Sequence, residues 1–473
     1  MCGIIGSFGK VKGLHKAFSL IENRGKDGYG SFHNNKIYKT SSKLKFKSKL
    51  KNVKQDFMIH NLHSLVGKEL QPLFDKGILV ANCEIYNYKE LNKKYNFQTK
   101  NDAKTLLHLL DKFDLKALDK LDGVYAFAYK NNNKVILVRD LLGVKPLWYS
   151  EKPFAFASEK KVLTFLGLKA KELNPRTILK YDIKTNKITT TKRDFYKISP
   201  ILKQNKTQLI RTLNTLFKDA VKKRLPINKN IGILFSGGID STILAMVIKS
   251  FGYNPTLYTA AFSDGNLQTA KDLLWARTVS KYLGLKLKVK VLNLKQTEKL
   301  VKELIPLIES NDVTKIGVAL PFYVCANMAK KDNVKILFSG LGSEEIFAGY
   351  ERHIQAKNVN KECLQGLKQM HERDLYRDDV IMMSKTIELR LPFLDKKLVA
   401  YALRIPANFK VSKEQKKIIL RDLAIKLGLY EEIALRKKLA AQYGSNFDKA
   451  LKKLAKKYGY KKKKQFLESA SVP

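Results

Sequence analysis

A short string near the middle of the chain, Ser236-Gly237-Gly238-Ile239-Asp240-Ser241-Thr242, contains residue types that could bind a phosphate group. Glycines let the backbone turn tightly and approach a ligand closely, and the free N–H groups of a helix that starts there attract anions. Asp240 adds a carboxylate of the kind that binds Mg²⁺. The string therefore predicts a loop that binds phosphate together with Mg²⁺, and the alternative is an ordinary strand-to-helix turn.

A second candidate for chemistry is Cys2, because removal of Met1 would make it the first residue of the chain. The free α-amine of an N-terminal residue can act as the general base for its own side-chain nucleophile. The alternative is that a small apolar residue simply begins a strand. The sequence thus offers a thiol nucleophile at its start and a phosphate loop in its middle.

The segments around the glycine string indicate a parallel α/β sheet. Ile231–Phe235 is a short apolar run rich in β-branched and aromatic residues, which is typical of a buried parallel strand, and Ile243–Ile248 continues as an apolar helical segment. Further strands are expected at Thr256–Ala261, Leu285–Leu292 and Val334–Phe338. Helices are expected at Thr207–Lys223 and at about Leu267–Leu283. This alternation predicts a doubly wound parallel sheet that binds ligands at the carboxyl ends of its strands.

The residues up to about Tyr196 follow a different pattern, in which turns separate alternating apolar segments. That pattern fits an α+β layered structure. Lys197–Lys206 interrupts it with a proline and polar residues, and we expect a linker there. Lys452–Ser471 is basic with a helical pattern, which indicates a solvated face. A length of 473 residues itself suggests two or three domains.

The charge balance is strongly basic, since 90 Lys and Arg residues stand against 43 Asp and Glu residues and give a formal net charge of +47. Such a surface attracts polyanions in a salt-dependent way, which would suit an RNA or an acidic partner. The alternative is a general bias toward lysine in the composition. We favour the bias, because the lysines are spread throughout the chain and do not form a stripe interleaved with aromatic residues.

Other features of the composition point to a globular cytoplasmic protein, with 44% hydrophobic and 10% aromatic residues. No apolar run reaches the length of a membrane helix, and the first residues lack the layout of a signal peptide, so we expect no membrane association. The cysteines are scattered without metal-ligand spacing, which favours a reduced cytosolic protein. They are Cys2, Cys83, Cys325 and Cys363.

Several more segments carry a resemblance to a known family. They are Arg24–Gly28, Gln71–Leu73, Ala81–Asn87, Asn101–Asp102, Leu121–Ala128, Val138–Leu147, Ser339–Glu345, Glu388–Asp395 and Lys417–Arg421. The glycine string resembles the pyrophosphate loop of ATP pyrophosphatases, which cleave ATP to AMP and pyrophosphate. Together these segments make the chain similar to glutamine-hydrolysing asparagine synthetases, from Met1 to about Ser445.

The resemblance implies two domains. Residues 1–200 would form a glutamine amidotransferase domain with the α+β N-terminal-nucleophile fold, in which two antiparallel sheets face each other between helices. Residues 207–473 would form an ATP-pyrophosphatase and synthetase domain built on an α/β doubly wound parallel sheet. The cofactors implied are ATP and Mg²⁺, and a homodimer is compatible with the resemblance.

Carried over by position, the resemblance implies a glutaminase centre around Cys2, whose thiol would attack the glutamine amide. The Asn82 side chain and the Cys83 N–H would hold the oxyanion. Glu84 and Asp102 would bind the glutamine α-amine, and Ser64 would also contact glutamine.

A nucleotide centre is implied in the second half, where Asp240 and Glu344 would bind Mg²⁺ and Lys417 would neutralise pyrophosphate. Two of the positions expected to contact ATP, Phe235 and Phe262, suit the protein core equally well. The full set expected at ATP is Phe235, Ser236, Gly237, Gly238, Asp240, Ser241, Phe262, Ser339, Gly340 and Lys417.

The chain departs from the family pattern at both centres. In the first half Lys26 replaces a proline, Cys83 replaces a glycine, and Leu62 replaces the arginine expected to bind the glutamine α-carboxylate. His60 or His63 could take over from that arginine, or either could be a packed structural residue.

The acceptor end departs too, because Gly317 stands where an arginine is expected and Leu341 where a glutamate is expected. The missing arginine would have bound the acceptor's carboxylate, and the missing glutamate is a candidate base for the attacking ammonia. The leucine in the second loop and Ala441–Ser445 resemble a subgroup, the asparagine synthetase domain-containing proteins.

The function predicted is therefore ATP-dependent synthesis of asparagine from aspartate, with nitrogen from glutamine. A first alternative keeps both centres but amidates a carboxylate other than that of aspartate. A second alternative is an RNA-associated or regulatory protein that binds ATP with weak amidation activity.

Overall fold

The computed structural model describes residues 2–265, 268–437 and 439–470. The chain divides into two compact units, Met1–Phe195 with Met383–Thr386, and Tyr196–Met382 with Ile387–Pro473. Met1, the expected helix start at Leu267 and the tail end at Ser471 lie outside the described residues.

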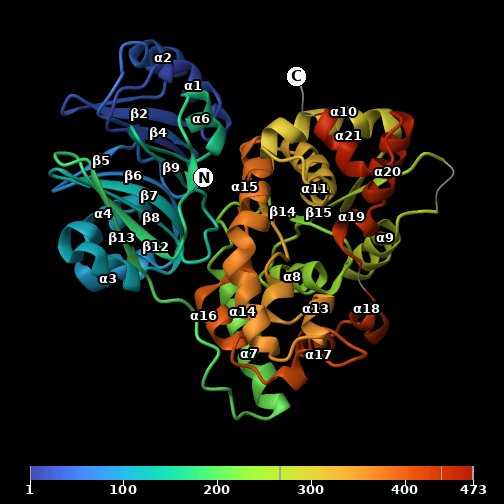
Figure 1. Ribbon diagram of the computed structural model, residues 1–473. Coiled ribbons are helices and arrows are strands. Elements are labelled where there is room, and N and C mark those ends of the chain that lie inside the picture. Colours follow the sequence, from blue (N-terminus) through green and yellow to red (C-terminus); the bar gives the residue numbers. More distant parts are fainter. Residues whose placement is uncertain (1, 266–267, 438, 471–473) are drawn as a thin grey trace. The chain divides into compact units, whose positions relative to one another are not determined.

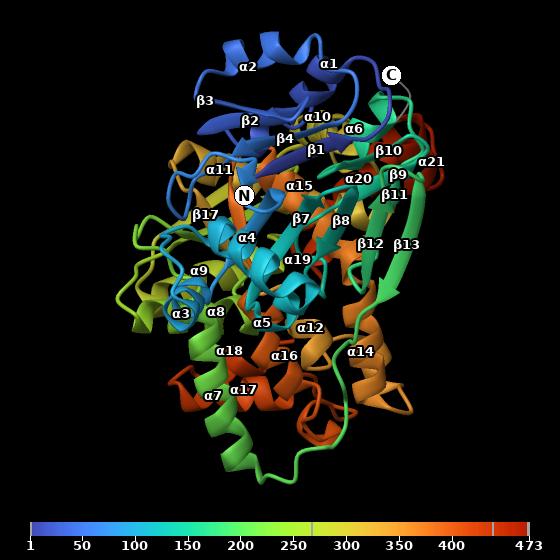
Figure 2. The ribbon, with the colours of Figure 1, turned by 90° about the vertical axis from the view of Figure 1, so that its left-hand side faces the viewer.

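Two antiparallel sheets form the amino-terminal unit (Figures 1 and 2). The first has the strand order β11-β9-β10-β1-β4-β2-β3 and the second β13-β12-β8-β7-β6-β5. Strands β1 and β4 pair antiparallel, as do β6 and β7. The strands are β1 Gly3–Ser7, β2 Gly28–His33, β3 Lys36–Thr40, β4 Phe57–Leu62, β5 Leu73–Phe74, β6 Ile78–Ile85, β7 Gly123–Asn131, β8 Lys134–Arg139, β9 Trp148–Glu151, β10 Phe154–Ala157, β11 Lys171–Glu172, β12 Thr177–Asp182 and β13 Lys187–Lys192.

Helices cover the outer faces of both sheets, while an apolar core fills the space between them (Figure 1). Met58 of β4 and Val80 of β6 belong to that inner core. Alternate residues of β6, such as Leu79 and Ala81, pack instead against helices. The predicted layered fold, with two facing antiparallel sheets between helices, is confirmed. The helices are α1 Leu14–Ser19, α2 Lys43–Leu50, α3 Tyr88–Tyr95, α4 Asp102–Phe113, α5 Ala117–Lys120 and α6 Lys160–Phe165.

The second unit is built on a five-stranded parallel sheet with the order β16-β15-β14-β17-β18. Its strands are β14 Gly232–Leu234, β15 Thr256–Phe262, β16 Leu287–Leu292, β17 Ile336–Phe338 and β18 Glu388–Arg390. The first three strands in the chain run outward in one direction, and the next two extend the sheet in the other. The direction of winding therefore changes between β14 and β17, which is where a doubly wound sheet binds its ligands. The predicted doubly wound parallel sheet is confirmed.

The expected elements of this unit are found close to their expected bounds. Helix α7 begins at Lys206 and is capped by Asn205, which accepts a hydrogen bond from the Gln208 N–H at 2.9 Å. The helices are α7 Lys206–Lys222, α8 Ile239–Ser250, α9 Lys271–Leu283, α10 Leu294–Ile308, α11 Val313–Lys331, α12 Ser343–Ile346, α13 Glu351–Ile354, α14 Val359–Met370, α15 Tyr376–Met383, α16 Lys396–Ala402, α17 Ile418–Lys426, α18 Glu431–Leu435, α19 Ala441–Gly444, α20 Phe447–Lys457 and α21 Lys463–Ser469.

The basic tail differs from its expected character as a purely solvated face. It contains the second half of α20 and all of α21, and its apolar residues Leu454, Phe466 and Leu467 are buried. Its lysines occupy the other side, so the tail is an amphipathic part of the second unit's core. Among the described residues, no helix combines the length and the apolar character needed to cross a bilayer.

Candidate functional site

Cys2 lies directly before β1, where neighbouring side chains hold its backbone. Its N–H donates to Asn82 Oδ1 at 2.9 Å, and Arg24 Nε donates to its carbonyl oxygen at 3.1 Å. Arg24 is in turn fixed by an ion pair with Glu159 at 2.8 Å, and both of these side chains are buried. The first residue expected in the processed chain is thus held in a defined position beside Asn82.

Asn82 lies in β6 and is fully buried. Its Oδ1 accepts the Cys2 N–H, whereas its Nδ2 is buried with no hydrogen-bond acceptor among the described residues. A buried donor without an acceptor costs free energy unless a ligand supplies one. This amide beside Cys2 is therefore placed to donate to an oxygen that gains negative charge during attack by the thiol.

A pocket opens beside Cys2. Four of the residues expected to contact glutamine line it together with Cys2, namely Ser64, Cys83, Glu84 and Asp102. Asn82 reaches the site through its bond to the Cys2 backbone. The structure therefore brings the predicted glutaminase residues together in one pocket of the amino-terminal unit.

Asp102 is oriented by the elements around it. It occupies the first turn of α4, where its Oδ1 accepts the Ala103 N–H at 2.9 Å and its Oδ2 accepts the Ile85 N–H at 3.0 Å. The Cys83 thiol lies 3.8 Å from the same Oδ2. Asn101 caps the helix by accepting the Lys104 N–H at 3.0 Å. The helix start thus presents a fixed carboxylate to the pocket.

Burial controls the titration of the groups in this pocket. It raises the pKa of the Cys2 thiol, an effect that the His63 N–H opposes. Burial and then Asp102 raise the pKa of Cys83 well above its usual value, so that thiol stays protonated near neutral pH. Burial lowers the pKa of His60 to about 3. His60 is therefore a neutral core residue and does not replace the missing arginine.

The second candidate site lies at the carboxyl ends of β14 and β17, where two loops of similar conformation face each other. In the first loop Ser236 Oγ accepts the Gly238 N–H at 3.3 Å, and in the second Ser339 Oγ accepts the Leu341 N–H at 3.2 Å. A Cβ added at Gly340 would lie only 2.7 Å from the Asp240 Cβ. The absence of a side chain at Gly340 thus lets the second loop approach the first closely.

Lys417 connects the acidic residues of these loops. Its Nζ lies 2.6 Å from Asp240 Oδ1 and 2.8 Å from Glu344 Oε1, and it donates to Ser343 Oγ at 3.0 Å. Its backbone has φ of 58°, a left-handed conformation that L-residues rarely adopt. Strain of this kind is often found at functional sites.

The two carboxylates fit a divalent cation. Asp240 and Glu344 converge on a single ammonium group, and carboxylate oxygens are the ligands that Mg²⁺ prefers. The Asp240 and Lys417 side chains are almost fully buried, so their charges act on each other in a medium of low dielectric. An Mg-bound pyrophosphate would supply both a cation for the carboxylates and an anion for the lysine.

The remaining residues expected at ATP lie around the same loops. Ser241 Oγ donates to the Gly238 carbonyl at 3.2 Å inside the first turn of α8. Phe235 and Phe262 are buried at the ends of β14 and β15, and they donate backbone hydrogen bonds to Tyr258 and Ser445, respectively. Their burial favours a core role for both rings.

Sequence reasoning missed Arg436. Its Nη1 donates to the Ser236 carbonyl at 3.0 Å, and its Nη2 pairs with Asp272 at 2.6 Å. Its guanidinium lies over the Trp275 ring, 5.3 Å from the centroid. Arg436 therefore fixes the glycine loop through the Ser236 carbonyl. Nothing in the basic sequence around Arg436 distinguishes it from other arginines.

Gly317 and Leu341, the two departures expected at the acceptor end, lie in α11 and in the second loop, respectively. Gly317 lies buried in α11, and a Cβ there would be 3.0 Å from the Cβ of Gln442 in α19. An arginine at this position would have to displace Gln442. Leu341 directly follows Gly340 in the second loop and is half-buried.

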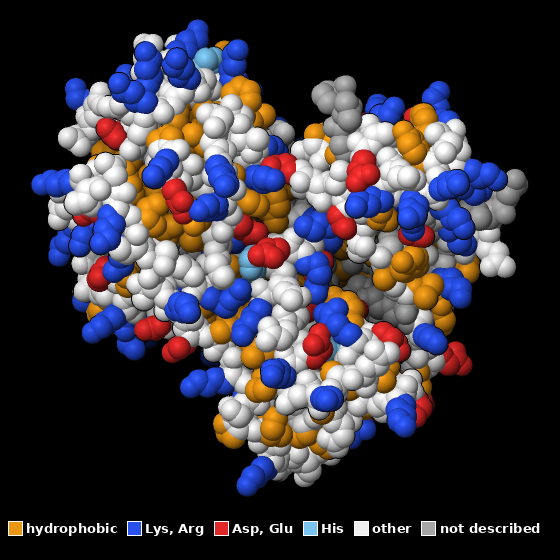
Figure 3. All heavy atoms as spheres, in the orientation of Figure 1, with side chains coloured by type: hydrophobic (Ala, Val, Ile, Leu, Met, Phe, Trp, Pro, Cys, Tyr) orange, Lys and Arg blue, Asp and Glu red, His pale blue; other side chains and the backbone are white. Residues whose placement is uncertain are grey.

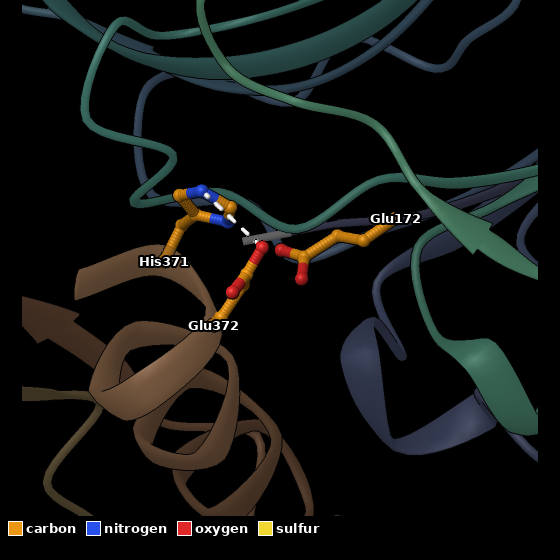
Figure 4. A group of neighbouring side chains, drawn as sticks. All are labelled: Glu172, His371 and Glu372. Carbon is orange, nitrogen blue, oxygen red and sulfur yellow. Dashed lines mark ion pairs between the residues drawn. The ribbon is translucent and has the colours of Figure 1, made fainter. Parts of the chain in front are cut away.

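Figure 4 shows a further pair of polar side chains, His371 and Glu372, whose Nε2 and Oε1 are 3.9 Å apart. Glu172, labelled with them, belongs to the amino-terminal unit, where it pairs with Arg139 at 2.8 Å. Within the second unit this pair alone does not supply the ligand number of a protein metal site.

Comparison with known proteins agrees with both units. A family model described as a glutamine amidotransferase domain matches residues 1–212, and one described as asparagine synthase matches residues 212–362 and 353–472.

Several relatives match along most of the chain. A protein of Methanocaldococcus jannaschii named putative asparagine synthetase (glutamine-hydrolyzing) 1 is 34% identical over 87% of this chain and 86% of its own length. A probable asparagine synthetase (glutamine-hydrolyzing) of Dictyostelium discoideum is 28% identical over 89% and 80%. The asparagine synthetase (glutamine-hydrolyzing) of Rattus norvegicus is 30% identical over 73% and 68%.

Proposed function

Because this chain belongs to the glutamine-hydrolysing asparagine synthetase family, we propose that it transfers the amide nitrogen of glutamine to a carboxylate that it activates with ATP. The most direct acceptor is the β-carboxyl group of aspartate, and the products are then asparagine, glutamate, AMP and pyrophosphate. The observation that carries the proposal is the convergence of Asp240, Glu344 and Lys417 at the switch point of the parallel sheet. The other unit supports it by holding Cys2 beside Asn82.

The first reaction is the hydrolysis of glutamine at Cys2. Its thiolate attacks the amide carbon, and the α-amine of the processed chain takes the thiol proton and delivers it to the leaving nitrogen. Asn82 Nδ2 and the Cys83 N–H stabilise the oxyanion that forms. Ammonia leaves, and water cleaves the thioester to give glutamate. Glu84 and Asp102 hold the α-amine of glutamine during these steps.

The second reaction activates the acceptor. A carboxylate oxygen attacks the α-phosphorus of ATP, the bond to the β-phosphate breaks, and pyrophosphate leaves. The glycine loop and the Ser339-Gly340 loop cradle the phosphates, and Lys417 moves from the carboxylates to the departing pyrophosphate. Asp240 and Glu344 would hold Mg²⁺, which would supply positive charge to offset part of the charge on the nucleotide. Ammonia then attacks the acyl carbon, and AMP is released.

The test is product analysis with the full chain, using glutamine, ATP, Mg²⁺ and a panel of carboxylates that includes aspartate. We expect AMP and asparagine to form only when aspartate is present. The Cys2→Ala variant should lose glutamine-dependent synthesis by more than a hundredfold and keep synthesis from added ammonium chloride. AMP formation with another carboxylate but not with aspartate would show that the acceptor is not aspartate. An acceptor other than aspartate is the second candidate function, and Gly317 and Leu341 favour it. Intact glutaminase activity in Cys2→Ala would refute the thiol mechanism.

The proposed working compartment is the cytoplasm. All four cysteines are free thiols, and Cys2 must stay reduced to act as a nucleophile.

A further inference from the structure

A glutamine molecule is a zwitterion, so the pocket beside Cys2 must bind an α-carboxylate as well as an α-amine. Three carboxylates line the pocket, Glu69, Glu84 and Asp102, and they suit the amine. Among the described lining residues there is no lysine or arginine, and His63 is the one side chain there that can become a cation. A buried carboxylate without a cationic or multiple hydrogen-bond partner is costly, which directs attention to this histidine.

His63 is well placed for the task. It directly follows β4, only 4% of its surface is exposed, and its backbone N–H bonds to the Cys2 thiol. Its Nδ1 lies 3.6 Å from Asp27 Oδ2, and the same carboxylate oxygen accepts the Ser64 N–H at 2.7 Å. A carboxylate next to an imidazole favours the imidazolium form and fixes the ring orientation.

The other cationic groups nearby are less suitable. Burial lowers the pKa of His60 to about 3, and His60 does not line the pocket. Lys145 is buried and acts electrostatically on Cys2 and Cys83, yet it is not among the lining residues. The charged groups near His63 are therefore Asp27, which faces its ring, and the three carboxylates that line the same pocket, while Lys145 acts on the neighbouring Cys2.

We propose that His63, as an imidazolium oriented by Asp27, binds the α-carboxylate of glutamine and takes the place of the arginine that Leu62 replaces. This inference rests on the proposed glutaminase function. It makes glutamine recognition dependent on pH, because an arginine stays protonated at every physiological pH and a histidine does not. The KM for glutamine should rise with pH as the imidazole loses its proton, while synthesis from ammonia should lack this dependence.

The experiment measures kcat and KM for glutamine hydrolysis between pH 5.5 and 8.5 in the full chain and in the variants His63→Gln and His63→Arg. We expect His63→Gln to raise the KM for glutamine at low pH at least tenfold, because one charge-assisted hydrogen bond is lost. The KM of this variant should also depend less on pH than that of the wild type. His63→Arg should restore a low KM at every pH. Glutaminamide, in which the α-carboxylate is replaced by a neutral amide, should be hydrolysed equally well by the wild type and by His63→Gln.

His108→Gln is the matched control, because His108 pairs with Asp75 at 3.3 Å in the same unit and does not line the pocket. Ammonia-dependent AMP formation checks that each variant is folded. A wild-type chain that hydrolyses no glutamine at any pH would refute the proposed function. If His63→Gln hydrolyses glutamine with the same KM as the wild type at every pH, the role of His63 is refuted while the proposed function stands. Equal losses with glutamine and glutaminamide would refute that role too.

Discussion

At the scale of single residues, Lys417 shows how one side chain can serve both stability and catalysis. Without substrate its ammonium group separates two carboxylates, those of Asp240 and Glu344, which would otherwise repel each other. In the proposed mechanism it neutralises pyrophosphate once substrate is bound, and the two carboxylates then bind Mg²⁺. Its backbone has φ of 58°, a strained conformation of the kind often found at functional sites.

The Lys417→Met variant keeps an unbranched side chain, one atom shorter than that of lysine, and removes the charge. We expect a loss of about 3–5 kcal/mol in the free energy of unfolding, because the two carboxylates then lack their buried partner. AMP formation should fall by more than a hundredfold, while glutamine hydrolysis at Cys2 should persist.

Thermal unfolding with and without MgCl₂ separates these roles. Mg²⁺ should raise the melting temperature of Lys417→Met more than that of the wild type, because it replaces the lost positive charge between the carboxylates. Equal effects of Mg²⁺ on both proteins would contradict the assignment of Asp240 and Glu344 as metal ligands.

At the scale of elements, the glycine loop depends on close contact with α9. Gly237 has φ of 64°, and a Cβ there would lie 2.6 Å from the carbonyl carbon of Trp275 and 2.8 Å from the Ala276 nitrogen. Both atoms belong to helix backbone, so they cannot move away as a flexible side chain would. The loop can adopt its conformation only if residue 237 has no side chain.

We therefore expect Gly237→Ala to displace the loop and reduce ATP-dependent AMP formation by more than a hundredfold. The matched control is Gly459→Ala, because Gly459 also has a positive φ, 77°, but a Cβ there meets nothing within 4 Å. Both substitutions place alanine in a left-handed conformation at a cost of about 1–2 kcal/mol. Similar AMP formation by the two variants would show that the contact with α9 has no role in nucleotide use.

The sequence predicted those elements whose residues share a single environment. The apolar run Ile231–Phe235 indicates the buried strand β14, because all of its residues suit an apolar environment. The glycines after it indicate the loop. Strand β18 was not predicted, since two of its three residues are charged. In the fold Glu388 and Arg390 satisfy each other at 2.6 Å, which allows a charged strand at the end of a parallel sheet.

Within the candidate sites, the sequence indicated residues that lie in recognisable strings, such as Cys2, Asn82 and Asp240. It did not indicate Arg436, whose partners Ser236 and Asp272 lie far away in the chain and are brought together only by folding. It left His60 and His63 as equal alternatives. Both side chains are buried, and only His63 lines the pocket beside Cys2, which no spacing rule could indicate.

At the scale of the whole molecule, the net charge of +47 has to be reconciled with a small-molecule enzyme. Lys and Arg side chains are scattered over the face drawn in Figure 3 and are interrupted by acidic and apolar groups. Several lysines are also paired locally, as Lys47 is with Glu22 and Lys457 with Glu298. A scattered distribution of this kind produces a long-range attraction for polyanions without a shaped site for any one of them.

We accordingly expect the full chain to bind single-stranded RNA at 50 mM salt without preference for sequence, and to lose about a thousandfold or more in affinity by 200 mM salt. The cause is that such binding consists almost entirely of phosphate contacts, whose free energy comes from counterion release. Fluorescence anisotropy with two unrelated RNA oligomers across a salt series measures it, and glutamine-dependent AMP formation is followed in the same buffers. Saturating RNA should leave the rate of AMP formation at 150 mM salt unchanged. Tight binding of one oligomer at 200 mM salt, or a change in AMP formation on its addition, would instead establish the RNA-associated or regulatory alternative, because scattered charge produces neither effect.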